Sequence, residues 1–331
     1  MIVTQRAYAR AGLVGNPSDS YFGKTISVIL RNFAATVDVW ESPRLEIRPH
    51  DRDLSNFESV GGLVDDVERH GYYGGVRLLK AAIKRFADYC AANGGPPLDH
   101  NFTIRYHTEI PRLVGMGGSS AIITAAMRAL CEFYGVSVPR EVLPSLILSV
   151  ETDELGIQAG LQDRVAQVYE GVVYMDLDRE LVDGRGWGDY EPMDPSLLPP
   201  LYVAYDARLA EPTERPHRTV RVLYERGDPR VVEVIRQIAD LAVLARDCLL
   251  TGQPDRLGPL MDRNFDLRCE IFDILPRQRA MVEAARSVGG SAKFAGSGGT
   301  IIGTYRDRAM LAMLRERLEA IGCQVIRPQI T

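Results

Sequence analysis

The sequence predicts an α+β protein of two domains. At 331 residues the chain exceeds the usual size of a single domain, so two hydrophobic cores are the default expectation. In its first part, alternating β-forming residues and helical spacing occur without a regular strand–helix alternation. Residues 183–200 are rich in Gly, Pro and Asp and indicate a passage between domains. The predicted domains are therefore residues 1–195 and 196–331.

The first domain is expected to mix strands with amphipathic helices. Its predicted strands cover residues 9–14, the extended stretch 25–50 with a turn at Ser42-Pro43, and 102–106. Its predicted helices cover residues 60–70, 76–89, 122–134 and 139–154, followed by a short helix that carries Asp163 near its start.

The second domain is predicted to place strands among long helices. The expected elements, in chain order, are a strand over 201–205, a polar loop over 210–219, helices over 231–250, 256–272 and 278–288, a strand over 300–302, a helix over 310–321 and a strand over 323–330.

Composition excludes several classes of function. The formal net charge is -5, and Lys and Arg are scattered, which argues against a nucleic-acid partner. No apolar run approaches the ~20 residues of a membrane span, and the N-terminus lacks the features of a signal peptide. The five cysteines are widely spaced and suggest free thiols in a reducing cytoplasm. We therefore expect a cytoplasmic protein, either a monomer or a homodimer, and its charge alone indicates no partner.

The most informative stretch is the glycine-rich loop at residues 110–121. Gly115, Gly117 and Gly118 precede a helix-forming run, so backbone N–H groups and the positive end of a helix dipole would meet there. Ser119 or Ser120 is expected to cap that helix. The loop predicts a cradle for an anion such as phosphate.

A polar turn near the N-terminus forms a second candidate site. Residues 10–24 carry Arg10, Asn16, Asp19 and Lys24 around the turn residues Gly15-Asn16-Pro17. The segment Gly23-Lys24-Thr25 suggests a P-loop, but that motif needs glycine where Ser18 stands. A P-loop is therefore excluded.

Three segments resemble sequence motifs of the GHMP kinases and occur along the chain in the order expected for that family. The loop from Pro111 to Ala121 looks like their ATP-binding motif, and residues 10–19 look like their substrate motif. Residues 293–300 look like their C-terminal glycine-rich motif. The resemblance implies an N-terminal domain like ribosomal protein S5 domain 2 and a ferredoxin-like C-terminal α/β sandwich.

Within that family the chain is most similar to the glucuronokinases. The likeness lies in residues 10–19, 71–79, 110–112, 117–122, 151, 155–157, 159–169 and 194–200. This likeness implies transfer of the ATP γ-phosphoryl group to the anomeric hydroxyl of D-glucuronate. Alternatives are a kinase for galacturonate, a heptose or a mevalonate-like alcohol, and a sensor that binds sugar and ATP without turnover.

The resemblance also implies which residues bind ATP and magnesium. ATP would be bound by Pro111, Gly115, Gly117, Gly118, Ser119, Ser120, Ala121, Gly296, Ser297 and Gly298. The Mg²⁺ ligands would be Ser119 and Glu151, a hydroxyl and a carboxylate that suit this ion, with Ser120 as an alternative to Ser119.

By the same resemblance Asp163 faces the attacking hydroxyl, and Arg10 beside it would keep it ionised and offset charge on the transferred group. Asp19 suits the ring hydroxyls, and a neutral Asn16 would not repel a uronic acid carboxylate. The cation for that carboxylate is left open among Arg112, Arg77 and Lys24.

Overall fold

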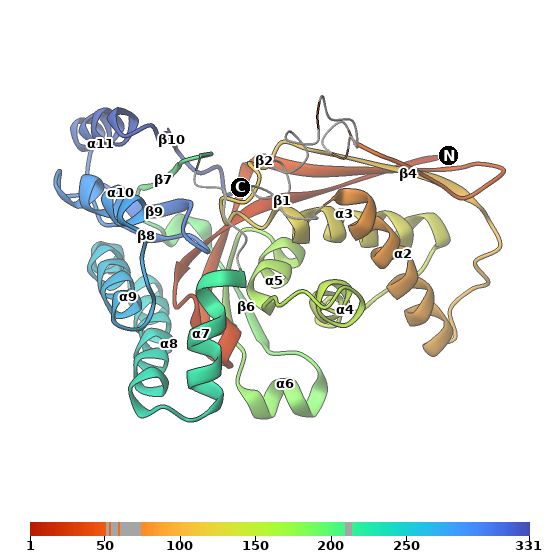
Figure 1. Cartoon of the computed structure of the whole chain (residues 1–331), viewed down its shortest axis with the longest axis horizontal. Coiled ribbons are helices and arrows are strands. Elements are labelled where there is room, and N and C mark those ends of the chain that lie inside the picture. Colours follow the sequence, from red (N-terminus) through yellow and green to blue (C-terminus); the bar gives the residue numbers. More distant parts are fainter. Residues whose placement is uncertain (51–52, 54–58, 60–73, 209–213) are drawn as a thin grey trace.

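A computed structural model describes residues 1–50, 53, 59, 74–208 and 214–331. Its strands form two sheets, one built from the N-terminal part of the chain and one from the C-terminal part. Figure 1 shows the two sheets side by side, with most helices packed below them in that view. The architecture is the two-domain α+β fold that the sequence predicts.

The first sheet is built around the long antiparallel pair β1 (Ile2–Val14) and β2 (Lys24–Glu41). Its strand order is β3-β4-β2-β5-β6, with β1 also paired to β2. The other strands are β3 (Glu46–Arg48), β4 (Phe102–Thr108), β5 (Val172–Asp176) and β6 (Asp189–Met193). Register shifts between Tyr8 and Ala9 and between Gly12 and Val14 interrupt the pairing of β1 with β2 close to the polar turn.

Helices cover one face of this sheet (Figure 1). Helices α2 (Gly75–Ala92), α3 (Gly118–Tyr134) and α5 (Leu161–Tyr169) pack against its strands, and α4 (Leu143–Ser149), followed by a π-helical turn at Val150–Glu154, packs on these helices. Helix α6 (Arg179–Arg185) connects β5 to β6 away from the sheet (Figure 1). Helix α3 packs on β1 and β2 through small side chains, including the fully buried Ala121, Ala125 and Ala129, which permit a close approach. The sheet thereby places the start of α3 beside the end of β1.

The second sheet is antiparallel, with the order β10-β7-β9-β8. Its strands are β7 (Leu201–Tyr205), β8 (Lys293–Phe294), β9 (Thr300–Thr304) and β10 (Gln324–Ile326). Its helices are α7 (Glu214–Glu225), α8 (Pro229–Leu250), α9 (Leu257–Ile271), α10 (Pro276–Arg286) and α11 (Arg308–Ala320). Short 3₁₀ turns lie at Ser18–Tyr21, Pro195–Leu197 and Pro254–Arg256.

The structure corrects three local predictions. Strand β6 lies inside the stretch 183–200 that was expected to be a linker, because it adds an edge strand to β5. Residues 214–219 begin helix α7 instead of continuing a polar loop. Gly117, not a serine, is the N-cap of α3. The predicted helix over 60–70 and residues 210–213 lie outside the described part of the chain.

The boundary near residue 195 stays a prediction, but strands on either side of it belong to different sheets. Strand β6 of the first sheet ends at Met193, and β7 of the second sheet begins at Leu201. One buried apolar cluster includes Leu13 of β1 together with Val203 and Ile302 of the second sheet. Packing across the two sheets therefore fixes how their loops meet.

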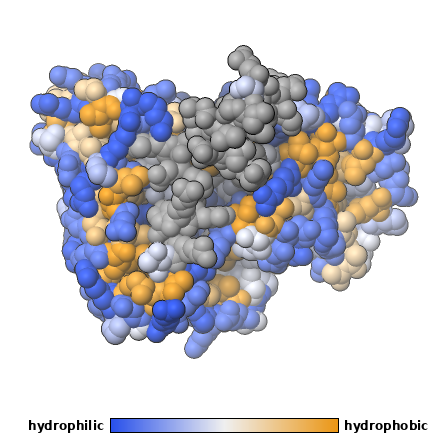
Figure 2. All heavy atoms as spheres, in the orientation of Figure 1, coloured by the Kyte–Doolittle hydropathy of each residue, from blue (hydrophilic) through white to orange (hydrophobic). Residues whose placement is uncertain are grey.

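The surface carries both hydrophilic and hydrophobic side chains, and the cysteines are not paired. On the face drawn in Figure 2, blue hydrophilic residues predominate along the margins, and orange hydrophobic residues lie in separate patches. Among the described residues, no helix combines the length and apolar character that crossing a membrane requires. All five cysteines are free thiols, as their spacing predicts.

Candidate active site

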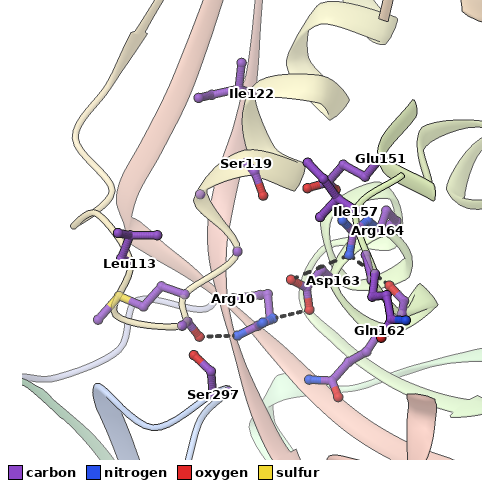
Figure 3. A pocket seen from close by; sticks show the side chains of 18 of the residues that line it. Arg10, Leu113, Ser119, Ile122, Glu151, Ile157, Gln162, Asp163, Arg164 and Ser297 are labelled. Carbon is purple, nitrogen blue, oxygen red and sulfur yellow. Dashed lines mark hydrogen bonds and ion pairs between the residues drawn. The ribbon is translucent and has the colours of Figure 1, made fainter. Parts of the chain in front are cut away.

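A cavity of about 580 Å³ brings together segments that are distant in the sequence. It is lined by the turn after β1, the glycine-rich loop before α3, the segment from Glu151 to Arg164, and residues Gly296 and Ser297. Cavities of this size hold small molecules in many proteins. Figure 3 shows the labelled side chains converging on it from these elements.

The start of helix α3 presents open backbone donors to this cavity. Its N-cap Gly117 is in the left-handed region with φ 72°, and no side chain in the described structure caps the first turn. The first helical N–H groups therefore remain available to an anion, at the positive end of the helix dipole. This geometry is what a phosphate cradle requires.

Two glycine-rich segments touch at the cavity wall. A Cβ on Gly296 would lie 2.2 Å from the carbonyl oxygen of Gly115, and one on Gly115 would lie 2.8 Å from the backbone nitrogen of Ser297. Gly115 also has a φ of +79°, which disfavours other residues. The C-terminal glycine-rich turn thus packs directly on the loop before α3, and only glycines permit this approach.

Arg10 joins three of the lining segments. Its Nε donates to Oδ1 of Asp163 at 2.6 Å, and its Nη1 donates to the carbonyl oxygens of Gly115 at 2.6 Å and Ala295 at 3.2 Å. Figure 3 shows Arg10 lying between the glycine-rich loop and Asp163. Because Arg10 is buried and Asp163 is partly accessible, the pair presents a carboxylate to the cavity with a guanidinium behind it.

Glu151 is a buried carboxylate held by a buried cation. It lies in the π-helical turn after α4, a distortion often found at functional sites. Arg164 forms an ion pair with Glu151 and donates through Nη1 to the carbonyl oxygen of Gly160 at 2.9 Å. The same Nη1 lies 3.8 Å from Oδ2 of Asp163. Arg164 therefore connects the two carboxylates that the sequence singled out, and sequence reasoning did not find it.

Asp19 lines the cavity in an unfavourable electrostatic environment. Burial, together with the negative charge of Asp163, raises the pKa of its carboxyl to about 6. A Cβ on Gly160 would lie 2.6 Å from Oδ2 of Asp19, so the loop before α5 is packed against this carboxyl. A carboxyl kept here at a cost to stability indicates a functional site.

The C-terminal domain holds the polar turn in place. Asn264 of α9 accepts a hydrogen bond from the backbone nitrogen of Gly15 at 2.7 Å and donates to the carbonyl oxygen of Asn16 at 3.0 Å. Lys293 of β8 contacts the side chain of Asn16. Sequence reasoning missed both residues, although Lys293 begins the third glycine-rich motif.

Most of the predicted site residues do meet in this cavity. It is lined by Arg10, Asn16, Asp19, Pro111, Arg112, Gly115, Gly117, Gly118, Ser119, Glu151, Asp163, Gly296 and Ser297, and by Arg77. Sequence reasoning also did not find Arg221, a lining residue that donates to the carbonyl oxygen of Ser20 at 3.3 Å.

Four predicted residues lie outside the lining. Lys24 pairs with Asp176 at 2.5 Å across β2 and β5, so its charge is used within the sheet. Ser120 is buried and donates to the carbonyl oxygen of Gly117 at 3.0 Å, and Ala121 faces the core. Gly298 is packed so closely that a Cβ would lie 2.6 Å from Nε2 of Gln278.

Comparisons with known proteins identify the family. Residues 77–171 match the model of the GHMP kinases N terminal domain, and residues 245–320 match GHMP kinases C terminal. The chain is 47% identical over 308 residues to probable glucuronokinase 2 of Arabidopsis thaliana. The aligned region covers 91% of this chain and 84% of that protein. The chain belongs to the GHMP kinases.

Further similarities agree with this GHMP kinase assignment. Glucuronokinase 1 of Arabidopsis thaliana is 44% identical over 306 residues, covering 91% of this chain and 84% of that protein. The phosphomevalonate kinase of Streptococcus pneumoniae superimposes with a TM-score of 0.77 over 100% of both chains at 15% identity, which shows a shared fold. As a GHMP kinase, the protein is an ATP-dependent phosphotransferase with an alcohol group as acceptor.

Proposed function

We propose that this kinase transfers the γ-phosphoryl group of ATP to the anomeric hydroxyl of D-glucuronate, giving glucuronate 1-phosphate and ADP. The names of the two relatives at 44% and 47% identity support glucuronate as the acceptor. The observation that carries the proposal is the Arg10–Asp163 pair in the cavity that the N-terminus of α3 also lines.

The phosphate chain of ATP would lie along the contact between the two glycine-rich segments. Backbone N–H groups at the start of α3 suit phosphate oxygens, and the guanidinium of Arg10 lies beside the same loop. In phosphoryl transfer the protein mainly positions the reactants and offsets phosphate charge. Gly115, Gly117, Gly118, Gly296 and Ser297 leave the backbone open for this close approach.

Ser119 and Glu151 fit the requirements of a magnesium ion that arrives with ATP. No cluster of three acidic, histidine or cysteine side chains that would hold a metal occurs among the described residues. Mg²⁺ bound to a nucleotide needs only one or two protein ligands, because phosphates and waters complete its shell. Ser119 lines the cavity whereas Ser120 does not, so we assign the hydroxyl to Ser119. The ion would neutralise phosphate charge, and Arg164 would keep Glu151 oriented.

Asp163 would orient the anomeric hydroxyl and accept its proton as the oxygen attacks the γ-phosphorus. The bond from that phosphorus to the β,γ-bridging oxygen breaks, and ADP leaves. Arg10 would hold the Asp163 carboxylate in place through its 2.6 Å hydrogen bond and offset negative charge on the transferred group.

The sugar would lie against the turn that carries Asn16 and Asp19, which both line the cavity. A carboxylate favours a guanidinium, which can bind it through two parallel hydrogen bonds. Arg112 and Arg77 line the cavity and remain candidates for this contact, and Arg221 beside Ser20 adds a third. Lys24 is not proposed, because it is engaged with Asp176.

A panel of acceptors tests the assignment. Purified protein with MgATP is offered glucuronate, galacturonate, a heptose, galactose and mevalonate, and ADP release is measured. We expect the highest kcat/KM for glucuronate. Turnover of another acceptor with indifference to glucuronate would contradict the substrate, and binding of ATP and sugar without turnover would indicate a sensor.

A further inference from the structure

Lys293 is a buried lysine whose contacts converge on the substrate turn. Its side chain is 1% exposed, and its Nζ donates to the carbonyl oxygens of Gly12 at 2.9 Å and Phe294 at 2.7 Å. Its third contact is with Oδ1 of Asn16. Three acceptors require three N–H donors, so the amine is protonated although burial lowers its pKa.

These contacts fix the direction of the Asn16 amide. Nδ2 of Asn16 donates to the carbonyl oxygen of Phe294 at 3.2 Å, and because a carbonyl oxygen can only accept, the amide atom that meets Lys293 is the oxygen. The amide oxygen is therefore occupied, and what Asn16 offers to a ligand in the cavity is its remaining N–H.

Glycine at position 12 permits this arrangement. A Cβ on Gly12 would lie 2.7 Å from Oδ1 of Asn16 and 2.7 Å from Nε2 of Gln162. The hydrogen bonds of Asn264 hold the backbone of the same turn, and the side chain of Asn16 is packed between Gly12 and Lys293.

The wall behind Asn16 also carries unbalanced positive charge. Lys293 and Arg268 are both buried, and no carboxylate in the described part of the chain forms a direct ion pair with either of them. Arg268 donates to the carbonyl oxygen of Gly296 at 3.0 Å, and the carboxyl of Asp19 acts on both cations only through longer-range attraction. Buried cations are costly, and the single carboxyl of Asp19 cannot balance both, so an anion at this end of the cavity would be stabilised.

We propose that Lys293 is a positioning residue that makes the Asn16 end of the cavity select an anionic group of the substrate, the carboxylate of a sugar acid. It does so in two ways, by turning the amide N–H of Asn16 toward the ligand and by supplying positive charge behind it. This inference rests on the proposed function and adds a residue to it that does not itself line the cavity.

The experiment compares glucuronate with its uncharged amide, glucuronamide, as acceptors for the wild type and for Lys293→Met. Methionine keeps much of the side-chain length but removes the charge and the donors. We expect the KM for glucuronate to rise at least tenfold, with kcat changed less than about threefold and KM for ATP unchanged. The preference for glucuronate over glucuronamide should fall by a similar factor. An unchanged preference, or equal losses on both acceptors, would overturn the proposal.

A double-mutant cycle separates positioning from a general structural effect. If Lys293 acts partly through Asn16, Asn16→Ala together with Lys293→Met should reduce the preference for glucuronate by less than the product of the two single losses. Losses that multiply would overturn the proposal. Where Lys293→Met does not fold, Lys293→Gln decides, because it keeps a polar side chain with N–H donors at this position and removes only the charge: a reduced preference for glucuronate supports the proposal and a retained one contradicts it. The proposed function fails separately, if the wild type does not phosphorylate glucuronate.

Discussion

Arg10 and Asp163, which are 153 positions apart in the sequence, are joined by a hydrogen bond of 2.6 Å from Nε to Oδ1. The same arginine binds the carbonyl oxygen of Gly115, so one side chain ties the substrate turn, the glycine-rich loop and the start of α5 together. The proposed chemistry depends on this three-way link.

Asp163→Asn is expected to lower kcat by about 10³-fold or more, because asparagine keeps the shape but cannot accept the proton of the hydroxyl. Binding of ATP should change little, since the glycine-rich loop keeps its own contacts. Single-turnover kinetics and nucleotide titration check the two expectations separately. Near-normal turnover in this variant would refute the role of Asp163.

Ser119→Ala and Ser120→Ala form a matched pair. Ser119→Ala should lower kcat/KM for MgATP at least tenfold, because its hydroxyl faces the cavity. Ser120→Ala should keep activity within about threefold and cost about 1 kcal/mol of stability, because Ser120 donates within the loop to Gly117. Initial rates across Mg²⁺ concentrations, with thermal unfolding, distinguish them. The reverse ranking of the two variants would assign the magnesium ligand to Ser120.

The pH profile of kcat/KM should show the titration of Asp19. Its pKa of about 6 predicts that activity toward the sugar falls as the pH drops below 6, when the carboxyl becomes neutral. The carboxyl of the substrate titrates about two units lower and does not produce this limb. Asp19→Asn should have a lower and flatter profile over pH 5–7. An identical acid limb in the variant would show that another group is responsible.

The same carboxyl predicts a gain in stability on its removal. Because the folded-state pKa of Asp19 is raised above the ordinary value of 3.8 for this side chain, its ionised form costs stability above about pH 6, and this cost disappears below about pH 4. Asp19→Asn should therefore raise the free energy of unfolding at pH 7.5 by about 1–2 kcal/mol. Thermal unfolding at pH 7.5 and at pH 4 measures the difference. An Asp19→Asn variant less stable than the wild type at pH 7.5 would show that the ionised carboxyl does not destabilise the fold.

Much of the fold could be predicted from the spacing of apolar residues along the sequence. The strand at 201–205 and the helix at 231–250 are clear because apolar residues recur at strand or helix spacing over their whole length. Strand β6 is harder to predict, since Gly, Pro and Asp around it are typical of a linker. Its pairing with β5, not its own composition, makes it a strand.

In the site, too, features that depend on local sequence could be predicted and features that depend on distant contacts could not. Glycines and acids in recognisable motifs could be predicted, because their chemistry depends on local spacing. Lys293, Asn264 and Arg164 could not, because their roles arise from contacts with residues that are far away in the sequence, such as Asn16 and Gly15. The partner of Lys24 could not be predicted from its local context either, because it is the sheet register that places Lys24 opposite Asp176.

The most direct test of the central claim is the identity of the phosphorylated product. Purified protein, MgATP and D-glucuronate are incubated, and the product is examined by ³¹P and ¹H nuclear magnetic resonance. Our account predicts ADP and a sugar phosphate whose phosphorus couples to the anomeric proton, formed at least about 10³-fold more slowly by Asp163→Asn. Phosphate on another hydroxyl, or hydrolysis of ATP without a sugar phosphate, would contradict it.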